Sequence, residues 1–226
     1  MKITDMKVHM MQVPLVRPFR ISLGVITHAV SCLVEIETDA GITGYGEGSP
    51  GPLITGENLP GTVETLRVFR EKLIGMDPRD IEGINAVMNR AVAYAGTAKA
   101  AVDIACHDIL GKAAGLPLYK LLGGLSNTIE TDMTVGIDTP ELMAAAAKEH
   151  VAAGFRVIKT KVGTNIADDI ARVKAIPGLH PDGFSHHRLL PHGWPLLWQY
   201  RLRYSFQPWS LSHGSLQPHA PLRQQP

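Results

Sequence analysis

Two lysines separated by one residue, Lys159 and Lys161, are the side chains best suited to chemistry by type and spacing. They lie in the segment FRVIKTKV at residues 155–162, whose composition predicts a strand. Side chains two positions apart on a strand point to the same face, about 6–7 Å from each other. Two ammonium groups that close disfavour each other's charge, so one lysine can be a neutral amine and act as a general base.

Spacing alone leaves an alternative open, in which both lysines are solvated on an exposed face of the strand. Two observations argue against it. The strand is otherwise apolar, at Val157, Ile158 and Val162. Parallel barrel strands also carry their functional polar residues near the C-terminal end, and Lys161 lies two residues before Gly163, where this strand should end.

The elements before the lysine pair form two patterns. Residues 1–125 predict an α+β domain, with a three-stranded antiparallel meander followed by helices. The expected strands are residues 2–13, 30–38 and 42–47, and the expected helices are 62–74, 80–92 and 97–114, followed by a short segment, 119–124, that ends in Gly-Gly. Between the first two strands, residues 13–28 contain Pro14 and Pro18, which predict a loop.

Residues 126–176 change to an alternation of strands and helices. The expected order is strand 131–137, helix 138–153, strand 155–162 and helix 165–176. About 25 residues per unit is typical of a parallel sheet or a (β/α) barrel. We therefore expect the first two βα units of an incomplete barrel after the N-terminal domain.

Three segments resemble one known family. GFRVIKTKVG at 154–163 resembles the K-x-K strand of the mandelate racemase/muconate lactonizing group of the enolase superfamily. GITGYGEGSP at 41–50 resembles that group's GxxGxGE stretch, and AKAAVDIACHDILGKAAGLPLYKLLGG at 98–124 resembles its long helix and Gly-Gly exit. ITGE at 54–57 and TDMTVGIDTPE at 131–141 further resemble the dipeptide epimerases of the L-Ala-D/L-Glu type.

The resemblance implies a metal-dependent isomerase with an N-terminal capping domain and a modified (β/α) barrel. Lys161 would abstract the proton α to a carboxylate, and Lys159 would favour its neutral form. A magnesium ion would hold the enolate, and a second lysine on a later strand would return the proton. The implied substrate-side residues are Phe19 and Arg20 in the first capping loop, Ile54 and Thr55 in the second, and Thr134 on the first barrel strand.

Plainer roles stay open for several of these residues. Arg20 could be a solvated loop arginine rather than the partner of a substrate carboxylate, and Thr134 could be an ordinary strand threonine. We interpret Glu47, at a strand end, and Asp103 and Asp108, on the long helix, as structural.

Residues 177–226 depart from the rest in composition. They hold all three tryptophans, six of the ten histidines and half of the prolines, but no Lys, Val or Ile. They could be a nucleic-acid or partner-binding tail, or a metal site at His186, His187 and His192. We favour a third interpretation, translation of a GC-rich gene in a wrong frame, and expect a disordered tail that leaves the barrel truncated.

The catalytic partners that the resemblance requires are missing from this sequence. The family's acidic magnesium ligands belong to the third, fourth and fifth barrel strands, yet Asp182 is the last acid and Lys174 the last lysine. We therefore assign no metal ligand and expect this polypeptide to be inactive. Alternatives are a muconate cycloisomerase, an o-succinylbenzoate synthase or a truncated interaction module without catalysis.

Composition and net charge limit the classes of partner that we expect the chain to bind. The chain is 45% hydrophobic and 19% charged with a net charge of +1, which gives no support for a nucleic-acid or membrane partner. Cys32 and Cys106 lie far apart in sequence and are expected to be reduced, buried thiols. Without a signal-peptide pattern or a long apolar run, we expect a cytoplasmic protein with a dipeptide or other carboxylate substrate, able to form a homo-oligomer.

The wrong-frame interpretation makes a prediction about the gene. Resequencing an independent clone around the codon for Ile176 should reveal a shift of reading frame there. An uninterrupted frame through residues 177–226 would contradict it.

Overall fold

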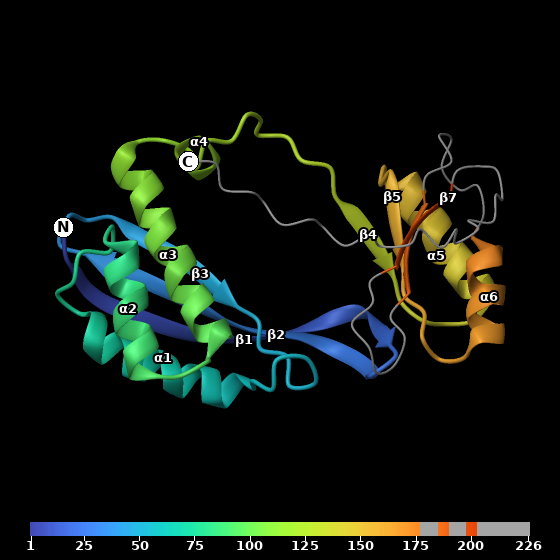
Figure 1. Ribbon diagram of the computed structural model, residues 1–226, viewed down its shortest axis with the longest axis horizontal. Coiled ribbons are helices and arrows are strands. Elements are labelled where there is room, and N and C mark those ends of the chain that lie inside the picture. Colours follow the sequence, from blue (N-terminus) through green and yellow to red (C-terminus); the bar gives the residue numbers. More distant parts are fainter. Residues whose placement is uncertain (177–184, 190–197, 203–226) are drawn as a thin grey trace, which may run out of the picture.

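The computed structural model describes residues 1–176, 185–189 and 198–202, the last two ranges through their backbone alone. Two parts are visible in Figure 1: an N-terminal module, residues 1–125, and a βα segment, residues 126–176. The link between them runs from the last helix of the module to the first strand of the segment, and a long β-hairpin extends from the module toward that same strand. The chain order of strands then helices, followed by alternation, confirms the predicted fold class.

The sheet of the N-terminal module is antiparallel, in the order β1-β2-β3. Its strands are β1 (Ile3–Ile21), β2 (Gly24–Thr38) and β3 (Thr43–Gly48). The expected loop at 13–28 is wrong, because β1 and β2 pair along most of it and form a hairpin, with Pro14 opposite His28 and Phe19 opposite Ile26. Proline is tolerated on an edge strand such as β1, and a register irregularity between Pro14 and Phe19 accommodates the proline-containing stretch.

The helices of the module follow the predicted positions within a few residues. They are α1 (Leu59–Leu73), α2 (Ile81–Ala91), α3 (Gly96–Ala114) and α4 (Leu118–Leu121). The side chains of Asn58 and Asp80 cap α1 and α2 by accepting hydrogen bonds from backbone amides three residues on. Gly115, in the left-handed conformation, ends α3.

One hydrophobic core joins the sheet to α1, α2 and α3, which lie on the same face of it (Figure 1). Met6 and Ile36 come from the sheet, and Phe69, Met88 and Ile109 come from the helices. Cys32 and Cys106 are both free and buried in this core, which confirms the expected buried thiols. Burial raises the pKa of the Cys106 thiol to about 12, so that it stays protonated and unreactive.

The closest contact of the module is between β3 and α3. Gly44, Gly46 and Gly48 alternate along β3 and present no side chain to the helix. A Cβ built on Gly46 would lie 1.9 Å from the carbonyl oxygen of Ala101, and one on Gly44 would lie 2.3 Å from that of Ala105. The glycines of β3 therefore allow the alanine-rich helix to pack backbone against backbone.

The βα segment forms a second, parallel sheet. Its elements are β4 (Asp132–Val135), α5 (Pro140–Ala152), β5 (Val157–Thr160) and α6 (Ile166–Ala175). Thr139 and Asn165 cap the two helices, as the sequence predicts for such starts. A small core of Val135, Met143, Ala147, Ile158 and Ile176 packs α5 against the strands.

Two short strands extend this sheet beyond the predicted elements. β6 (Ser185–Leu189) pairs parallel to β5, and β7 (Trp198–Leu202) pairs antiparallel to β6. The backbone of β5 offers an open edge to such a partner whatever its side chains are, which is why composition did not indicate these strands. The rest of the predicted tail, and the side chains of His186, His187 and His192, lie outside the described residues. Within the described part, no helix is long and apolar enough to cross a membrane.

The contact between β3 and α3 predicts a stability effect. Gly46→Ala places a methyl group inside the van der Waals distance of the α3 backbone, and should lower the free energy of unfolding by about 3 kcal/mol. Chemical denaturation followed by circular dichroism measures it. Gly96→Ala is the matched control, because a Cβ at Gly96 meets nothing within 4 Å; equal stability of the two variants would contradict this packing.

Candidate active site

The lysine pair lies at the end of β5, beside β4. Thr134 of β4 is in register with Lys159, and the amide of Lys161 donates a 3.0 Å hydrogen bond to the carbonyl oxygen of Val135. Both lysines are half-buried. Thr160 between them is 1% exposed and faces away, and its hydroxyl has no hydrogen-bond partner in the described part of the chain. Thr134 therefore shares a sheet face with the lysine pair.

The loops that follow β4 and β5 are held by polar contacts behind the lysines. The amide of Gly163 donates to the carboxylate of Asp169 at 2.8 Å, and Arg172 pairs with the same carboxylate at 2.8 Å. Arg172 also donates to the carbonyl oxygen of Asp138, in the loop after β4, at 2.8 Å. The Asp169 and Arg172 side chains are only 13% and 12% exposed, so this pair ties both strand ends to α6.

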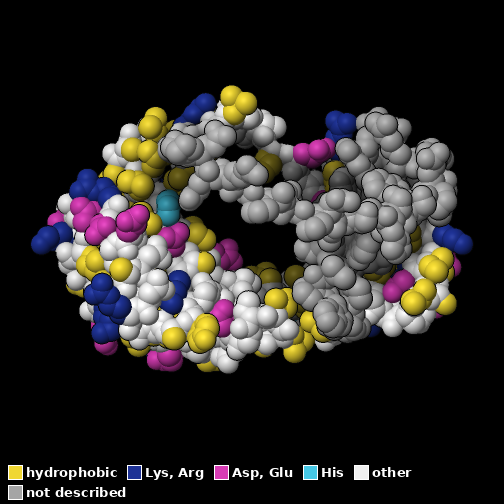
Figure 2. All heavy atoms as spheres, in the orientation of Figure 1, with side chains coloured by type: hydrophobic (Ala, Val, Ile, Leu, Met, Phe, Trp, Pro, Cys, Tyr) yellow, Lys and Arg dark blue, Asp and Glu magenta, His cyan; other side chains and the backbone are white. Residues whose placement is uncertain are grey.

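The hairpin of the N-terminal module reaches this strand end. The amide of Ile137 donates to the carbonyl oxygen of Arg20 at 2.9 Å. Arg17 forms a 2.8 Å ion pair with Glu149 of α5, although both side chains are mostly exposed. Through these contacts the structure brings Phe19 and Arg20 next to the end of β4, while Figure 2 shows open space between the bulk of the module and the βα segment.

The second predicted capping loop is arranged differently. Ile54 is 77% exposed, and the amide and hydroxyl of Thr55 both donate to the carbonyl oxygen of Gly51 within the same loop. Glu57 fixes the loop to the module by accepting hydrogen bonds from the amide and hydroxyl of Thr97, at the start of α3. The hydrogen bonds of Thr55 thus stay within its own loop, and the assignment of Ile54 and Thr55 to the substrate remains a prediction.

The acids interpreted as structural have partners inside the module. Asp103 accepts from the amide nitrogen of Asn85 at 2.7 Å. Asp108 pairs with Lys112 at 2.6 Å and accepts from the backbone amide of Tyr45 at 3.0 Å. Glu47 is exposed on β3. The contacts of Asp103 and Asp108 join neighbouring elements of the module and lie away from the lysine strand.

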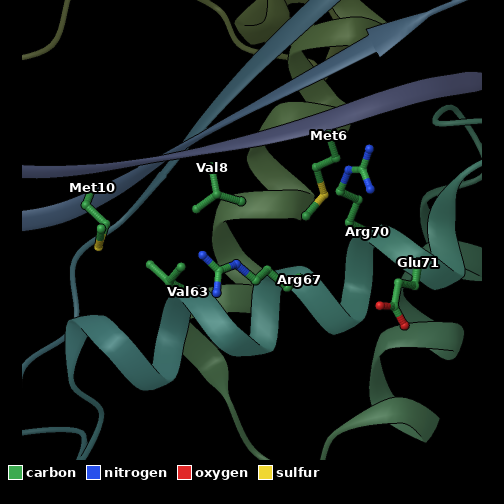
Figure 3. A pocket seen from close by; sticks show the side chains of 7 residues that line it. All are labelled: Met6, Val8, Met10, Val63, Arg67, Arg70 and Glu71. Atoms are coloured by element: carbon green, nitrogen blue, oxygen red, sulfur yellow. The ribbon is translucent and has the colours of Figure 1, made fainter.

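A shallow hollow on the N-terminal module is a weaker candidate (Figure 3). It lies between β1 and α1 and is lined by Met6, Val8, Met10, Val63, Arg67, Arg70 and Glu71. Its two arginines are already paired, Arg67 with Glu64 and Arg70 with Asp5 at 2.8 Å. The Arg70 guanidinium also holds the pKa of Asp5 below its usual range. Both positive charges that line the hollow are therefore already paired, which leaves no free cation there for an anionic ligand.

A magnesium site needs several oxygen ligands that converge. Among the described residues, no group of three or more His, Cys, Asp or Glu side chains is placed to hold a metal ion. Residues 1–176 therefore do not fit a magnesium ion by themselves.

Comparison with known protein families concerns the N-terminal module. Residues 3–123 match the family model described as the mandelate racemase/muconate lactonizing enzyme N-terminal domain. The chain belongs to this family. The match spans the N-terminal module, including the β3 glycines and α3, and so confirms the family predicted from sequence motifs.

The similar proteins are epimerases. The hydrophobic dipeptide epimerase of Enterococcus faecalis is 53% identical over 176 residues, covering 78% of this chain and 50% of that protein. Its crystal structure with magnesium and the dipeptide L-Leu-L-Tyr has a TM-score of 0.80 at 50% identity, covering 83% of this chain and 53% of that one. The chain thus spans about half the length of the curated relatives it matches.

A second relative matches over a longer stretch. The D-Ala-D/L-Ala epimerase of Cytophaga hutchinsonii is 35% identical over 215 residues, covering 94% of this chain and 58% of that protein. Similarity is therefore not limited to a stretch of about 176 residues, and the wrong-frame interpretation of residues 177–226 remains a prediction.

Sequence reasoning missed three residues that position the site. Gly136, Arg17 and Glu149 make the contact between the hairpin and the βα segment. The TDMTVGIDTPE motif contains Gly136, but the motif alone does not indicate the contact of this glycine with the hairpin. Arg17 and Glu149 are 132 positions apart, and no local pattern indicates such a pair.

Proposed function

We propose that residues 1–176 supply the capping domain and the first catalytic base of a magnesium-dependent dipeptide epimerase. The reaction is a 1,1-proton transfer at the carbon α to a carboxylate, through an enolate. The observation that carries the proposal is the half-buried lysine pair at the end of a parallel strand. The epimerase relatives, at 53% identity and below, support it.

Each residue of the site has a distinct role in this proposal. The neutral amine of Lys161 takes the α-proton, and the ammonium group of Lys159 on the same face disfavours a second positive charge beside it. Phe19 and Arg20 on the hairpin, Ile54 and Thr55 on the second loop, and Thr134 on β4 contact the substrate. Magnesium, when bound, would neutralise the charge that develops on the carboxylate.

The 226-residue polypeptide by itself is proposed to be inactive. Beyond Lys174 there is no lysine to return the proton, and Asp182 is the last acid available to a metal. Incubation with magnesium and L-Ala-L-Glu in D2O, followed by NMR of the α-proton, should show no exchange above background. Clear turnover by the purified chain would contradict this part of the proposal.

A chimera tests the proposed lineage. Residues 1–176 are joined to the remaining barrel of the Enterococcus faecalis epimerase, whose matched region they replace. The chimera should epimerise dipeptides, because its two parts then supply both bases and the metal ligands.

Substitution of the base within this chimera makes the test specific. Lys161→Ala should lower kcat by about 10²–10⁴-fold, the usual contribution of a positioned acid–base group. Lys148→Ala, an exposed lysine on α5, is the matched control and should leave kcat unchanged. Equal kcat for the two variants would contradict the assignment of Lys161 as base, and a chimera without activity would contradict the lineage.

A further inference from the structure

The strand positions around the lysine pair bring one glycine into the site. Val135, the last residue of β4, is in register with Thr160, the last residue of β5, so Gly136 and Lys161 are the residues that directly follow the two strand ends. Thr134, two residues before Gly136, is in register with Lys159 and shares its sheet face. Gly136 therefore lies at the same end of the sheet as the lysine pair.

The hairpin occupies the space where a side chain of residue 136 would lie. A Cβ built on Gly136 would lie 3.2 Å from the carbonyl oxygen and 3.3 Å from the amide nitrogen of Arg20, and 3.3 Å from the Phe19 ring. Contacts this short are tighter than nearly all those that real Cβ atoms make, so a methyl group at position 136 requires its neighbours to move by a few tenths of an ångström. Two of the three atoms belong to the backbone of β1, which cannot yield by rotating a side chain.

Position 136 requires glycine because the hairpin leaves no room for a side chain, and not because the backbone adopts an unusual conformation there. Gly136 is not among the glycines with positive φ, which in the βα segment are Gly154 and Gly163. Any residue could adopt its conformation, so a larger one is opposed only by the hairpin. The hydrogen bond from the Ile137 amide to the Arg20 carbonyl lies next to it and needs the same close approach.

We infer that Gly136 is a positioning residue for substrate binding: its missing side chain lets the hairpin of the capping domain seat Phe19 and Arg20 at the end of β4, the strand that pairs with the lysine strand. The inference rests on the proposed function in one respect, the substrate role of Phe19 and Arg20. The Arg17–Glu149 ion pair is a second contact between the hairpin and the βα segment, although an exposed pair adds little stability. A side chain at position 136 displaces the hairpin by a few tenths of an ångström or more, and leaves the lysine strand in place.

The docking itself is measured on the 226-residue chain. Hydrogen exchange of the Ile137 amide should be faster by about tenfold in Gly136→Ala, because its bond to Arg20 opens more often, and faster still in Gly136→Val. Gly96→Ala, which meets nothing within 4 Å, should exchange as the parent does. The amides of the core of the N-terminal module report that each variant is folded. Unchanged exchange at Ile137 in the folded alanine variant would overturn the inference.

The consequence for substrate is measured in the chimera. Gly136→Ala should raise KM for a dipeptide about tenfold and change kcat by less than about threefold, because the hairpin binds substrate while Lys161 is unmoved. Gly96→Ala should change neither constant. An active chimera in which both variants have the same KM, or in which Gly136→Ala lowers kcat alone, would overturn this inference. A chimera with no activity would instead contradict the proposed function, and the Ile137 exchange would still decide the docking.

Discussion

The site depends on one constraint: the backbone of the hairpin must come close to the backbone at the end of β4. The carbonyl oxygen of Arg20 accepts from the Ile137 amide at 2.9 Å, and Gly136 leaves no side chain in the way. Residues 110 or more positions apart in sequence are thereby held at one strand end. Because β5 lies in register beside β4, fixing the hairpin on β4 also fixes it relative to Lys159 and Lys161.

Glycines also permit a close backbone contact inside the N-terminal module. Gly44, Gly46 and Gly48 let α3 approach β3 until backbone atoms touch, which fixes the helix against the sheet without large side chains. The packing of the module from which the hairpin extends therefore also depends on glycine. Two close backbone contacts therefore fix the position of the lysine strand relative to the core of the module. One holds α3 against β3 within the module, and the other holds the hairpin against the end of β4.

Much of this fold could be predicted from sequence, because the signals were local. Asp80, Thr139 and Asn165 stand where helices were expected to begin, and each caps a helix in the structure, whereas α1 begins at Leu59, three residues before its expected start. The K-x-K spacing placed two side chains on one strand face without any tertiary information. Where prolines interrupted the pattern, at residues 13–28, local reasoning predicted a loop, and pairing with the opposite strand prevailed instead.

The contacts that complete the site could not be predicted in this way. The Arg17–Glu149 pair joins an edge strand to a helix of another sheet, and Gly136 carries no chemical group that a pattern could indicate. β6 depends on the open edge of β5 rather than on its own composition. Each of these follows from the meeting of distant segments, which only the three-dimensional arrangement shows.

The stereochemistry of proton exchange tests the central claim, that Lys161 is a base serving one face of the substrate. In the chimera carrying Lys161→Ala, α-proton exchange with D2O is measured by NMR for each epimer of a dipeptide separately. We predict that exchange is lost for one epimer and persists for the other, which the second base still serves. Exchange of both epimers at the rate of the parent chimera would contradict the account.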